Sequence, residues 1–302
     1  MGVRHVAYPK IPTVSAGAGA GGPWTATEKV HGAQLVIGYE GRVLHVGKRR
    51  AWLADGEAFF GWQLLRPRFA LLAEAALARG GTSVRVYGEL FGGHYPHPDV
   101  PPTAGASPVQ TGIWYSPDIR FAVFDVLVDD DTFLPYKEIS ELAGHAGVDV
   151  VPLLGRGALK EVDAVPVRYP TRVPAALGLP ELPGNVAEGL VLRPDTRMSA
   201  ERRPIVKHKI EEFDEKRFAE SQAWDPWLPL AMADLRRIVG SLVNGPRLAS
   251  ARSKVGSAGL LDEVVLDVMV DLTEAFPFAT AALGPDEEAE LHTLIRTLAA
   301  LL

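Results

Sequence analysis

Cysteine is absent from this 302-residue chain, and long hydrophobic runs are absent as well. Without cysteine there are no disulfides, thiolate metal sites or cysteine nucleophiles, so any metal must be held by carboxylates, histidines or phosphates. No stretch approaches the ~18 to 20 uninterrupted apolar residues of a membrane span, and residues 1–10 lack the apolar core of a secretion signal. We therefore expect a cytoplasmic protein that does not enter a membrane.

An overall excess of positive charge is also missing, since the formal net charge is −6. This excludes a protein coated with phosphate-binding cations. The negative charge is uneven, because Asp and Glu outnumber Lys and Arg in residues 224–302, whereas Lys29 and residues 42–50 bring several cations close together. The sequence thus allows a local basic cleft on an acidic protein. A hydrophobic fraction of 47% predicts a globular protein with a sizeable core.

Two patterns that bind phosphate in other proteins are incomplete in this chain. Residues 17–22 fit G-x-G-x-x-G, but Pro23 and Trp24 follow where a dinucleotide site needs a helix. Residues 41–49 lack the glycine spacing of a P-loop, and Arg49 stands where that loop needs Ser or Thr. The first run is therefore interpreted as a flexible loop, and an NAD-dependent oxidoreductase is the least favoured function.

Alternating apolar residues bounded by turn-forming residues predict strands in the first two thirds of the chain. They cover residues 34–39, 42–46, 83–90, 120–128, 148–154, 188–193 and 204–209, with a hairpin turn at residues 40–41. Helical spacing predicts helices within residues 57–79, broken at Pro67, and over residues 135–147. Residues 94–118 are interpreted as a surface loop and residues 165–183 as a proline-rich linker.

From Trp224 onward the pattern is helical. Apolar residues at helical spacing predict three amphipathic helices, which are separated by Gly245-Pro246 and by residues 277–285. Pro285, followed by two acidic residues, predicts the start of the last one. We therefore expect two domains, residues 1–222 and residues 223–302, the second being small and all-α.

Four short polar stretches interrupt the apolar pattern of the first domain. They are Lys29-Val30-His31-Gly32, Gly88-Glu89-Leu90, Glu188-Gly189-Leu190-Val191 and Val206-Lys207-His208-Lys209. Each has an ordinary structural explanation, such as a turn or a strand end. The period of two places Lys207 and Lys209 on one strand face, where they could simply protect an exposed edge from aggregation.

Taken together and in this order, these stretches and residues 120–125 resemble motifs I, III, IIIa, IV and V of the covalent nucleotidyltransferases, which include polynucleotide ligases and mRNA capping enzymes. The resemblance covers residues 24–217, and its specificity lies in order and spacing. Within that superfamily the chain is most similar to the T4 RNA ligase 2-like family, which includes the kinetoplastid RNA-editing ligases. The features that point to this family are His31, Lys48-Arg49, the aromatic pair Phe59-Phe60 and the stretch Val109-Gln110-Thr111-Gly112. Gln34 departs from the family, which usually has Asn there.

The resemblance implies an α+β fold: a nucleotidyltransferase domain of the ATP-grasp-like ligase adenylation type, made of antiparallel sheets with helices, followed by the helical domain. It implies an ATP-dependent RNA ligase acting on RNA with 5′-phosphate and 3′-hydroxyl ends. By the same resemblance Glu89 holds the ribose, Phe124 stacks on adenine, and Arg49 contacts phosphates at the RNA end. Glu28, His31 and Gly32 are implied to line the nucleotide pocket, whereas for Asp125 structural and functional roles stay open.

The chemistry of the residues agrees with this reading. A lysine nucleophile attacks as the neutral amine, a form that neighbouring cations favour, and Lys29 is the candidate. Lys207 and Lys209 would neutralise the triphosphate and the charge of the transition state. Glu188 is the candidate ligand of Mg²⁺ or Mn²⁺, because such ions take one or two carboxylates together with phosphate oxygens and waters.

Other functions remain possible from the sequence. A DNA ligase or a GTP-dependent capping enzyme would use the same lysyl-nucleotide chemistry. A catalytically silent nucleic-acid-binding protein could use the same scaffold without forming a covalent adduct.

Overall fold

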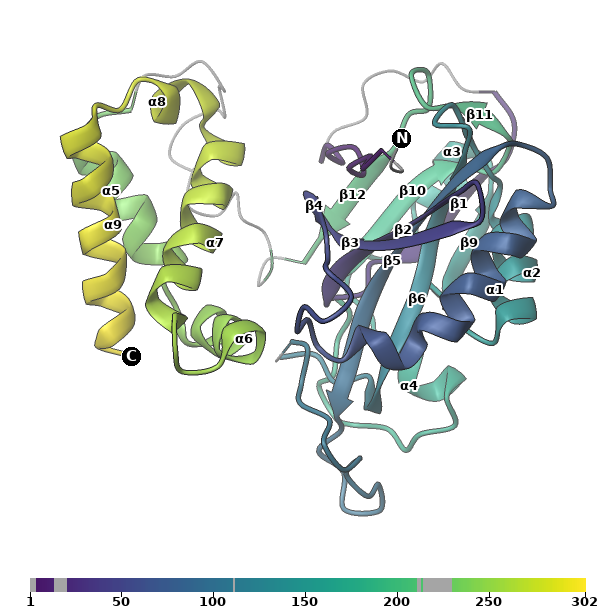
Figure 1. Cartoon of the computed structure of the whole chain (residues 1–302), viewed down its shortest axis with the longest axis horizontal. Helices are drawn as coiled ribbons and strands as arrows, with labels where there is room; N and C mark the ends of the chain where they lie inside the picture. The colour runs from purple at the N-terminus through teal and green to yellow at the C-terminus, as the bar shows by residue number, and fades with distance from the viewer. Residues whose placement is uncertain (1–3, 14–20, 111, 211–212, 214–229) are drawn as a thin grey trace. The chain divides into compact units, whose positions relative to one another are not determined.

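The computed structural model describes residues 4–13, 21–110, 112–210, 213 and 230–302 (Figure 1). The chain divides into two compact units, Met1–Phe213 and Asp214–Leu302. The domain boundary expected at residues 222–223, Thr111 and most of the glycine-rich run at residues 17–22 lie outside the described residues. Within the described residues, no helix is both long and apolar enough to cross a membrane.

Two sheets form the N-terminal unit. The smaller sheet has the antiparallel order β12-β10-β1-β9 and the larger has the order β11-β7-β6-β5-β2-β3-β4, with β8 pairing in parallel with β6. The smaller sheet contains β1 (Trp24–Glu28), β9 (Leu153–Gly157), β10 (Gly189–Pro194) and β12 (Val206–Lys209). The larger contains β2 (Ala33–Glu40), β3 (Val43–Lys48), β4 (Ala51–Trp52), β5 (Ser83–His94), β6 (Ser116–Val128), β7 (Thr132–Phe133), β8 (Asp149–Val150) and β11 (Met198–Ser199).

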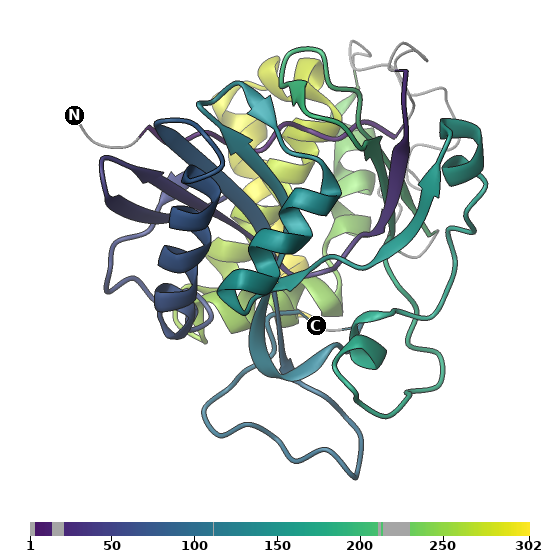
Figure 2. The same cartoon turned by 90° about the vertical axis from the view of Figure 1, so that its right-hand side faces the viewer.

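Alternation along the strands sends side chains to both faces of the larger sheet. One face packs Leu35, Val86 and Phe121 against the 3-10 helix η1 (Trp62–Leu65), α1 (Arg66–Leu77) and α2 (Tyr136–Ala146). Figure 2 shows α1 and α2 in front of this sheet. On the other face, Val36 and Tyr87 pack against Val191 of the smaller sheet. The two sheets therefore face each other across a second core, and α3 (Leu159–Asp163) and α4 (Val173–Ala176) complete the unit.

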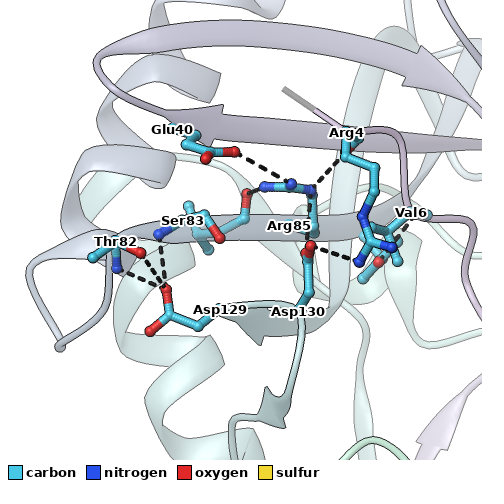
Figure 3. Close-up of polar contacts among 10 residues, drawn as sticks. Arg4, Val6, Glu40, Thr82, Ser83, Arg85, Asp129 and Asp130 are labelled. Carbon is cyan, nitrogen blue, oxygen red and sulfur yellow. Dashed lines mark hydrogen bonds and ion pairs between the residues drawn. The ribbon is translucent and has the colours of Figure 1, made fainter. Parts of the chain in front are cut away.

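An N-terminal segment, Arg4 to Pro12, crosses from one sheet to the other. Arg85 of β5 is 1% exposed, donates from Nε to the Arg4 carbonyl (3.1 Å) and lies near Asp130 (3.5 Å) and Glu40 (3.7 Å), as Figure 3 shows. The Tyr87 hydroxyl donates to the Val6 carbonyl. At its other end, the segment accepts a hydrogen bond at the Pro12 carbonyl from the Lys207 backbone of β12.

Most expected strands and helices are confirmed, and four expectations for the N-terminal unit need correction. The hairpin turn consists of Gly41 and Arg42, both with positive φ, instead of residues 40–41, because Glu40 still pairs with Val43. The strand expected at 148–154 is divided between β8 and β9, which belong to different sheets.

The loop expected at 94–118 is shorter, because β6 begins at Ser116, and it buries Val109, Ile113 and Tyr115. The proline-rich linker expected at 165–183 is packed within the N-terminal unit and contains α4.

The C-terminal unit is helical, as expected from its apolar spacing. Its described residues form five helices where three were expected, and residues 277–285, expected to separate two helices, contain a short helix themselves. Its helices are α5 (Met232–Leu242), α6 (Gly245–Val255), α7 (Leu260–Ala275), α8 (Pro277–Ala281) and α9 (Pro285–Ala300). Gly245-Pro246, expected to separate helices, instead begins α6, where proline is tolerated in the first turn and Asn244 caps the Arg247 backbone. The start of α9 at Pro285 is confirmed. A core of aliphatic residues from α5, α7 and α9 holds the unit together.

We predict that Arg85→Ala lowers the free energy of unfolding by about 3 to 5 kcal/mol, because it breaks a buried charge arrangement. Arg79→Ala is the matched control, since the Arg79 side chain is 37% exposed and pairs with Glu141 at the surface. The control should lose about 1 kcal/mol or less. Urea denaturation of both variants measures the difference, and equal losses would contradict the role assigned to Arg85.

Candidate active site

Lys29 lies in the short connection between β1 and β2, one strand from each sheet. The backbone at the start of this connection is fixed, because Glu28 N donates to the Pro152 carbonyl (2.8 Å) and Lys29 N to the Gly189 carbonyl (2.9 Å). Gly32 must be glycine here, since a Cβ would lie 2.1 Å from the Leu90 carbonyl oxygen. The turn is thus held against the smaller sheet at Lys29 and against β5 at Gly32.

Glu188 is the centre of the charged cluster around Lys29. Its Oε2 is 2.6 Å from Lys29 Nζ and 3.5 Å from His31 Nδ1, and its Oε1 is 3.2 Å from Lys209 Nζ. Burial by itself would raise the pKa of this carboxyl, whose side chain is 3% exposed, but Lys29 and Lys209 outweigh it and hold the pKa well below its ordinary value. Glu188 is therefore a buried anion that is paired with two cations, Lys29 in the β1–β2 connection and Lys209 of β12.

Gly189 allows β12 to approach Glu188 closely. Its φ is +153°, and a Cβ at this position would lie 2.0 Å from the His208 carbonyl oxygen. In the β10–β12 register Gly189 is opposite Lys209, which explains how Lys209 reaches the carboxylate. Lys207 lies two residues earlier and shares the strand face of Lys209.

Glu89 of β5 lies on the sheet face that also carries Gln34 of β2, because the two residues are directly opposite in the antiparallel register. Burial raises the pKa of Glu89 to about 8; the charge of Lys29 opposes this shift, and Glu188 adds to it. Arg49, in the turn between β3 and β4, also acts electrostatically on Glu89. Glu89, Lys29, Glu188 and Arg49 are thus close enough to share one electrostatic environment.

Phe124 occupies a β-bulge in β6. Tyr87 pairs with Asp125 and Gly88 with Val123, which leaves Phe124 as the extra residue. Its ring lies 4.9 Å from that of Tyr8 and packs against the cores on both sides of the site. Asp125, 0% exposed, accepts from the Tyr8 hydroxyl (2.7 Å) and pairs with Arg203 (2.7 Å), so its contacts are structural.

The structure therefore brings most of the expected site residues together. Lys29, His31, Glu188 and Lys209 are in direct contact, and Glu89 and Arg49 interact with them electrostatically. Glu28, by contrast, directs its carboxylate to Thr171 Oγ1 (2.5 Å) and Arg172 N (2.8 Å). Burial raises the pKa of Glu28 to about 7, although both hydrogen bonds oppose the shift.

Arg193 is a further candidate site residue, which the sequence motifs do not include. It is 2% exposed, and its Nη2 has no hydrogen-bond partner among the described residues. Because Arg193 and Val191 share a face of β10, this charge lies between the two sheets, and it acts on Tyr8 and Tyr136. A buried guanidinium with an unused donor suits a ligand that brings acceptors. The sequence contains one signal for this residue, which is an arginine directly after the apolar run Leu190-Val191-Leu192.

Comparison with known proteins places these observations in a family. The family model described as RNA ligase matches residues 22–209, more than half of the chain. RNA-editing ligase 2, mitochondrial, from Trypanosoma brucei brucei is 36% identical over 56% of this chain and 48% of the relative. RNA-editing ligase 1, mitochondrial, from the same organism is 32% identical over 56% and 44% of the two chains. The chain thus spans about half the length of these relatives.

Among solved structures, the Naegleria gruberi RNA ligase with PPi matches with a TM-score of 0.43 and 15% identity, over 66% of this chain and 52% of the other. A mutant of the same ligase with ATP and Mn also has a TM-score of 0.43 and 15% identity, over 63% and 50% of the two chains.

We predict that Glu89→Gln flattens the pH dependence of stability. The folded state raises the pKa of Glu89 from 4.5 to about 8, so its stabilising contribution is complete below 4.5 and is lost as the pH rises through about 8. Glu138→Gln is the control, because Arg197 lowers the pKa of Glu138 below its ordinary 4.5, so its contribution is lost only in more acidic solution and this variant should keep the unmodified slope above pH 5. Urea unfolding at about pH 5.5 and about pH 8.5 measures the slope of each variant in the range where Glu89 titrates, and a Glu89→Gln slope equal to that of the unmodified protein would contradict the assignment.

Proposed function

The chain belongs to the RNA ligase family, and we propose that it is an ATP-dependent RNA ligase whose nucleophile is Lys29. Lys29 takes AMP from ATP, AMP passes to an RNA 5′-phosphate, and an RNA 3′-hydroxyl then displaces AMP and seals the strand. The observation that carries this proposal is the cluster in which Lys29 Nζ lies 2.6 Å from Glu188 and Lys209 lies 3.2 Å from the other oxygen of that carboxylate. The reaction is assigned to the N-terminal unit.

In the first step Lys29 must release Glu188 and a proton before it attacks, because only the neutral amine is nucleophilic. A bond forms between Nζ and the α-phosphorus of ATP, and the bond from that phosphorus to the bridging oxygen breaks as pyrophosphate leaves. Lys209 and Lys207 offer positive charge to the phosphates on the strand next to Glu188. The cluster thus supplies both the nucleophile and the charge that stabilises the transition state.

Glu188 fits the role of metal-side carboxylate. Among the described residues, no group of three His, Asp or Glu side chains could hold a metal ion by itself. Mg²⁺ and Mn²⁺ sites of nucleotide enzymes commonly use one or two carboxylates and complete their coordination with phosphate oxygens and water. When bound, the ion would neutralise phosphate charge. Glu188 would hold it together with ATP, and its deprotonated state suits this role.

The base of ATP is assigned to the space between the sheets. Phe124 offers an aromatic ring there, and Arg193 supplies a buried donor with no hydrogen-bond partner among the described residues. In the second and third steps, Arg49 in the exposed turn between β3 and β4 provides a cation near Glu89 for the phosphates of the RNA ends. These features support RNA with a 5′-phosphate and a 3′-hydroxyl as the substrate, and ATP as the nucleotide.

We predict that the protein forms a covalent adduct with labelled ATP and Mg²⁺ that survives denaturation in detergent, and that intact-mass measurement and peptide mapping locate one AMP on Lys29. Lys29→Arg is the matched variant, because it keeps a cation beside Glu188 but removes the amine nucleophile. It should form no adduct. Labelling from GTP but not from ATP would favour a capping-type enzyme, and no labelling from either would favour a silent nucleic-acid-binding protein.

We predict that Lys207→Ala abolishes adenylylation, with a loss of at least about 100-fold in rate, because a phosphate-facing cation is removed. The midpoint temperature of its thermal unfolding should equal that of the unmodified protein. Lys137→Ala is the control, since the Lys137 side chain is 79% exposed on α2 and contacts only the surface residue Glu141 in the ion pairs described. Full adduct formation by Lys207→Ala would show that this strand is assigned wrongly.

A further inference from the structure

The predicted linker at residues 165–183 contributes to a segment that is attached to the β1–β2 connection, which carries Lys29. Residues 169–171 pair with residues 185–187 as a short ribbon, through Thr171 N to the Asn185 carbonyl and Ala187 N to the Tyr169 carbonyl, each 3.0 Å. The second strand of this ribbon leads directly into Glu188. We call residues 169–187 the clasp.

The first attachment is to Glu28, the residue before Lys29. Its carboxylate is 1% exposed and accepts hydrogen bonds from Thr171 Oγ1 (2.5 Å) and Arg172 N (2.8 Å). A buried carboxylate without donors would be costly, so these two bonds decide where the end of β1 lies. The clasp therefore fixes the residue whose peptide bond leads to Lys29.

The second attachment is to the backbone of Lys29 itself. The Gly189 carbonyl accepts from Lys29 N (2.9 Å) and also from the Tyr169 hydroxyl (2.6 Å). The carbonyl of Gly189, the residue after Glu188, is therefore shared between Tyr169 of the clasp and the backbone of Lys29. Removing the Tyr169 hydroxyl would leave the Lys29 hydrogen bond in place but remove a restraint on its acceptor.

The third attachment passes through the loop before β6. Asn185 binds both backbone groups of Trp114, accepting from its N–H (2.9 Å) and donating to its carbonyl (2.7 Å). The next residue, Tyr115, accepts at its hydroxyl from the backbone N–H of His31 (2.9 Å). Tyr95 of the same loop donates to the Pro180 carbonyl within the clasp. The connection is thus held on both sides of Lys29.

We propose that the clasp positions Lys29 for attack on the α-phosphate, and that Tyr169 and Thr171 are positioning residues for the adenylylation step. This inference rests on the proposed function. Neither side chain is assigned a contact with ATP or RNA; each acts through a neighbour of Lys29. Because nucleophilic attack requires alignment to within a fraction of an ångström, a small displacement of the Lys29 backbone lowers the rate of attack while leaving nucleotide binding largely unchanged.

Single-turnover adenylylation tests the proposal with Thr171→Val and Tyr169→Phe, which remove one hydroxyl each and keep the shape of the side chain. The rate of adduct formation at saturating ATP should fall about 10- to 100-fold, with the KM for ATP within about twofold of the unmodified value. Thr171→Ser, which restores a hydroxyl, should recover most of the rate. Adduct formation by the unmodified protein in the same assay tests the proposed function separately.

The controls remove equivalent hydroxyls elsewhere in the N-terminal unit. Thr132→Val deletes a bond to Asp131 (2.7 Å), and Tyr39→Phe deletes a bond to Glu74 (3.2 Å) on α1. Both should keep the unmodified rate, and thermal unfolding of every variant identifies any that fails to fold. Unchanged rates in folded Thr171→Val and Tyr169→Phe, or a rise in KM that accounts for the whole effect, would overturn the proposal. So would a Thr171→Ser variant as slow as Thr171→Val.

Discussion

The buried carboxylate of Glu188 is the constraint on which the site of the N-terminal unit depends. An anion that is 3% exposed is tolerated only when cations and donors surround it, and removing one partner from such a group costs several kcal/mol. Its partners Lys29, His31 and Lys209 come from the β1–β2 connection and from β12, whereas Glu188 itself precedes β10. A slip of one residue in the β10–β12 register would move Lys209 to the opposite face and leave the charge uncompensated. The same contacts therefore specify both the strand register and the arrangement of the site.

Three carboxyl groups close to Lys29 in the fold have different charge states, and the difference has a chemical consequence. Glu188 has a pKa well below its ordinary value, whereas burial raises the pKa of Glu28 to about 7 and that of Glu89 to about 8. Near neutral pH the site therefore contains one full negative charge and two carboxyl groups that are substantially protonated. A triphosphate is repelled less by such a site than by three carboxylates. A protonated Glu89 can also donate a hydrogen bond to a ligand oxygen, which an ionised carboxylate cannot do.

The sequence predicted those features that depend on local periodicity or on the order of motifs. The hairpin of β2 and β3, the strand carrying Lys207 and Lys209, and the meeting of Lys29 with Glu188 belong to this group. Features that depend on tertiary contacts were not predictable. The bulge at Phe124 shifts the alternation of β6 by one residue, so a period of two cannot say which way that ring points. The proline-rich composition of residues 165–183 is typical of a linker, but Thr171 is buried there because a carboxylate 143 residues away in sequence needs its hydroxyl.

Ion pairing and backbone hydrogen bonding have separate roles in placing Lys29. In the proposed adenylylation, the 2.6 Å contact with Glu188 orders the Lys29 side chain before the reaction, but it has to break when Nζ forms a bond to phosphorus. It therefore cannot be what holds the nucleophile during attack. The hydrogen bond from Lys29 N to the Gly189 carbonyl and the bond from His31 N to Tyr115 involve no reacting atom. They can persist while the side chain exchanges the carboxylate for the phosphate, and Lys209 can keep Glu188 ionised during that exchange. In the proposed mechanism, the backbone network, more than the ion pair, thus keeps the amine aligned through the chemical step.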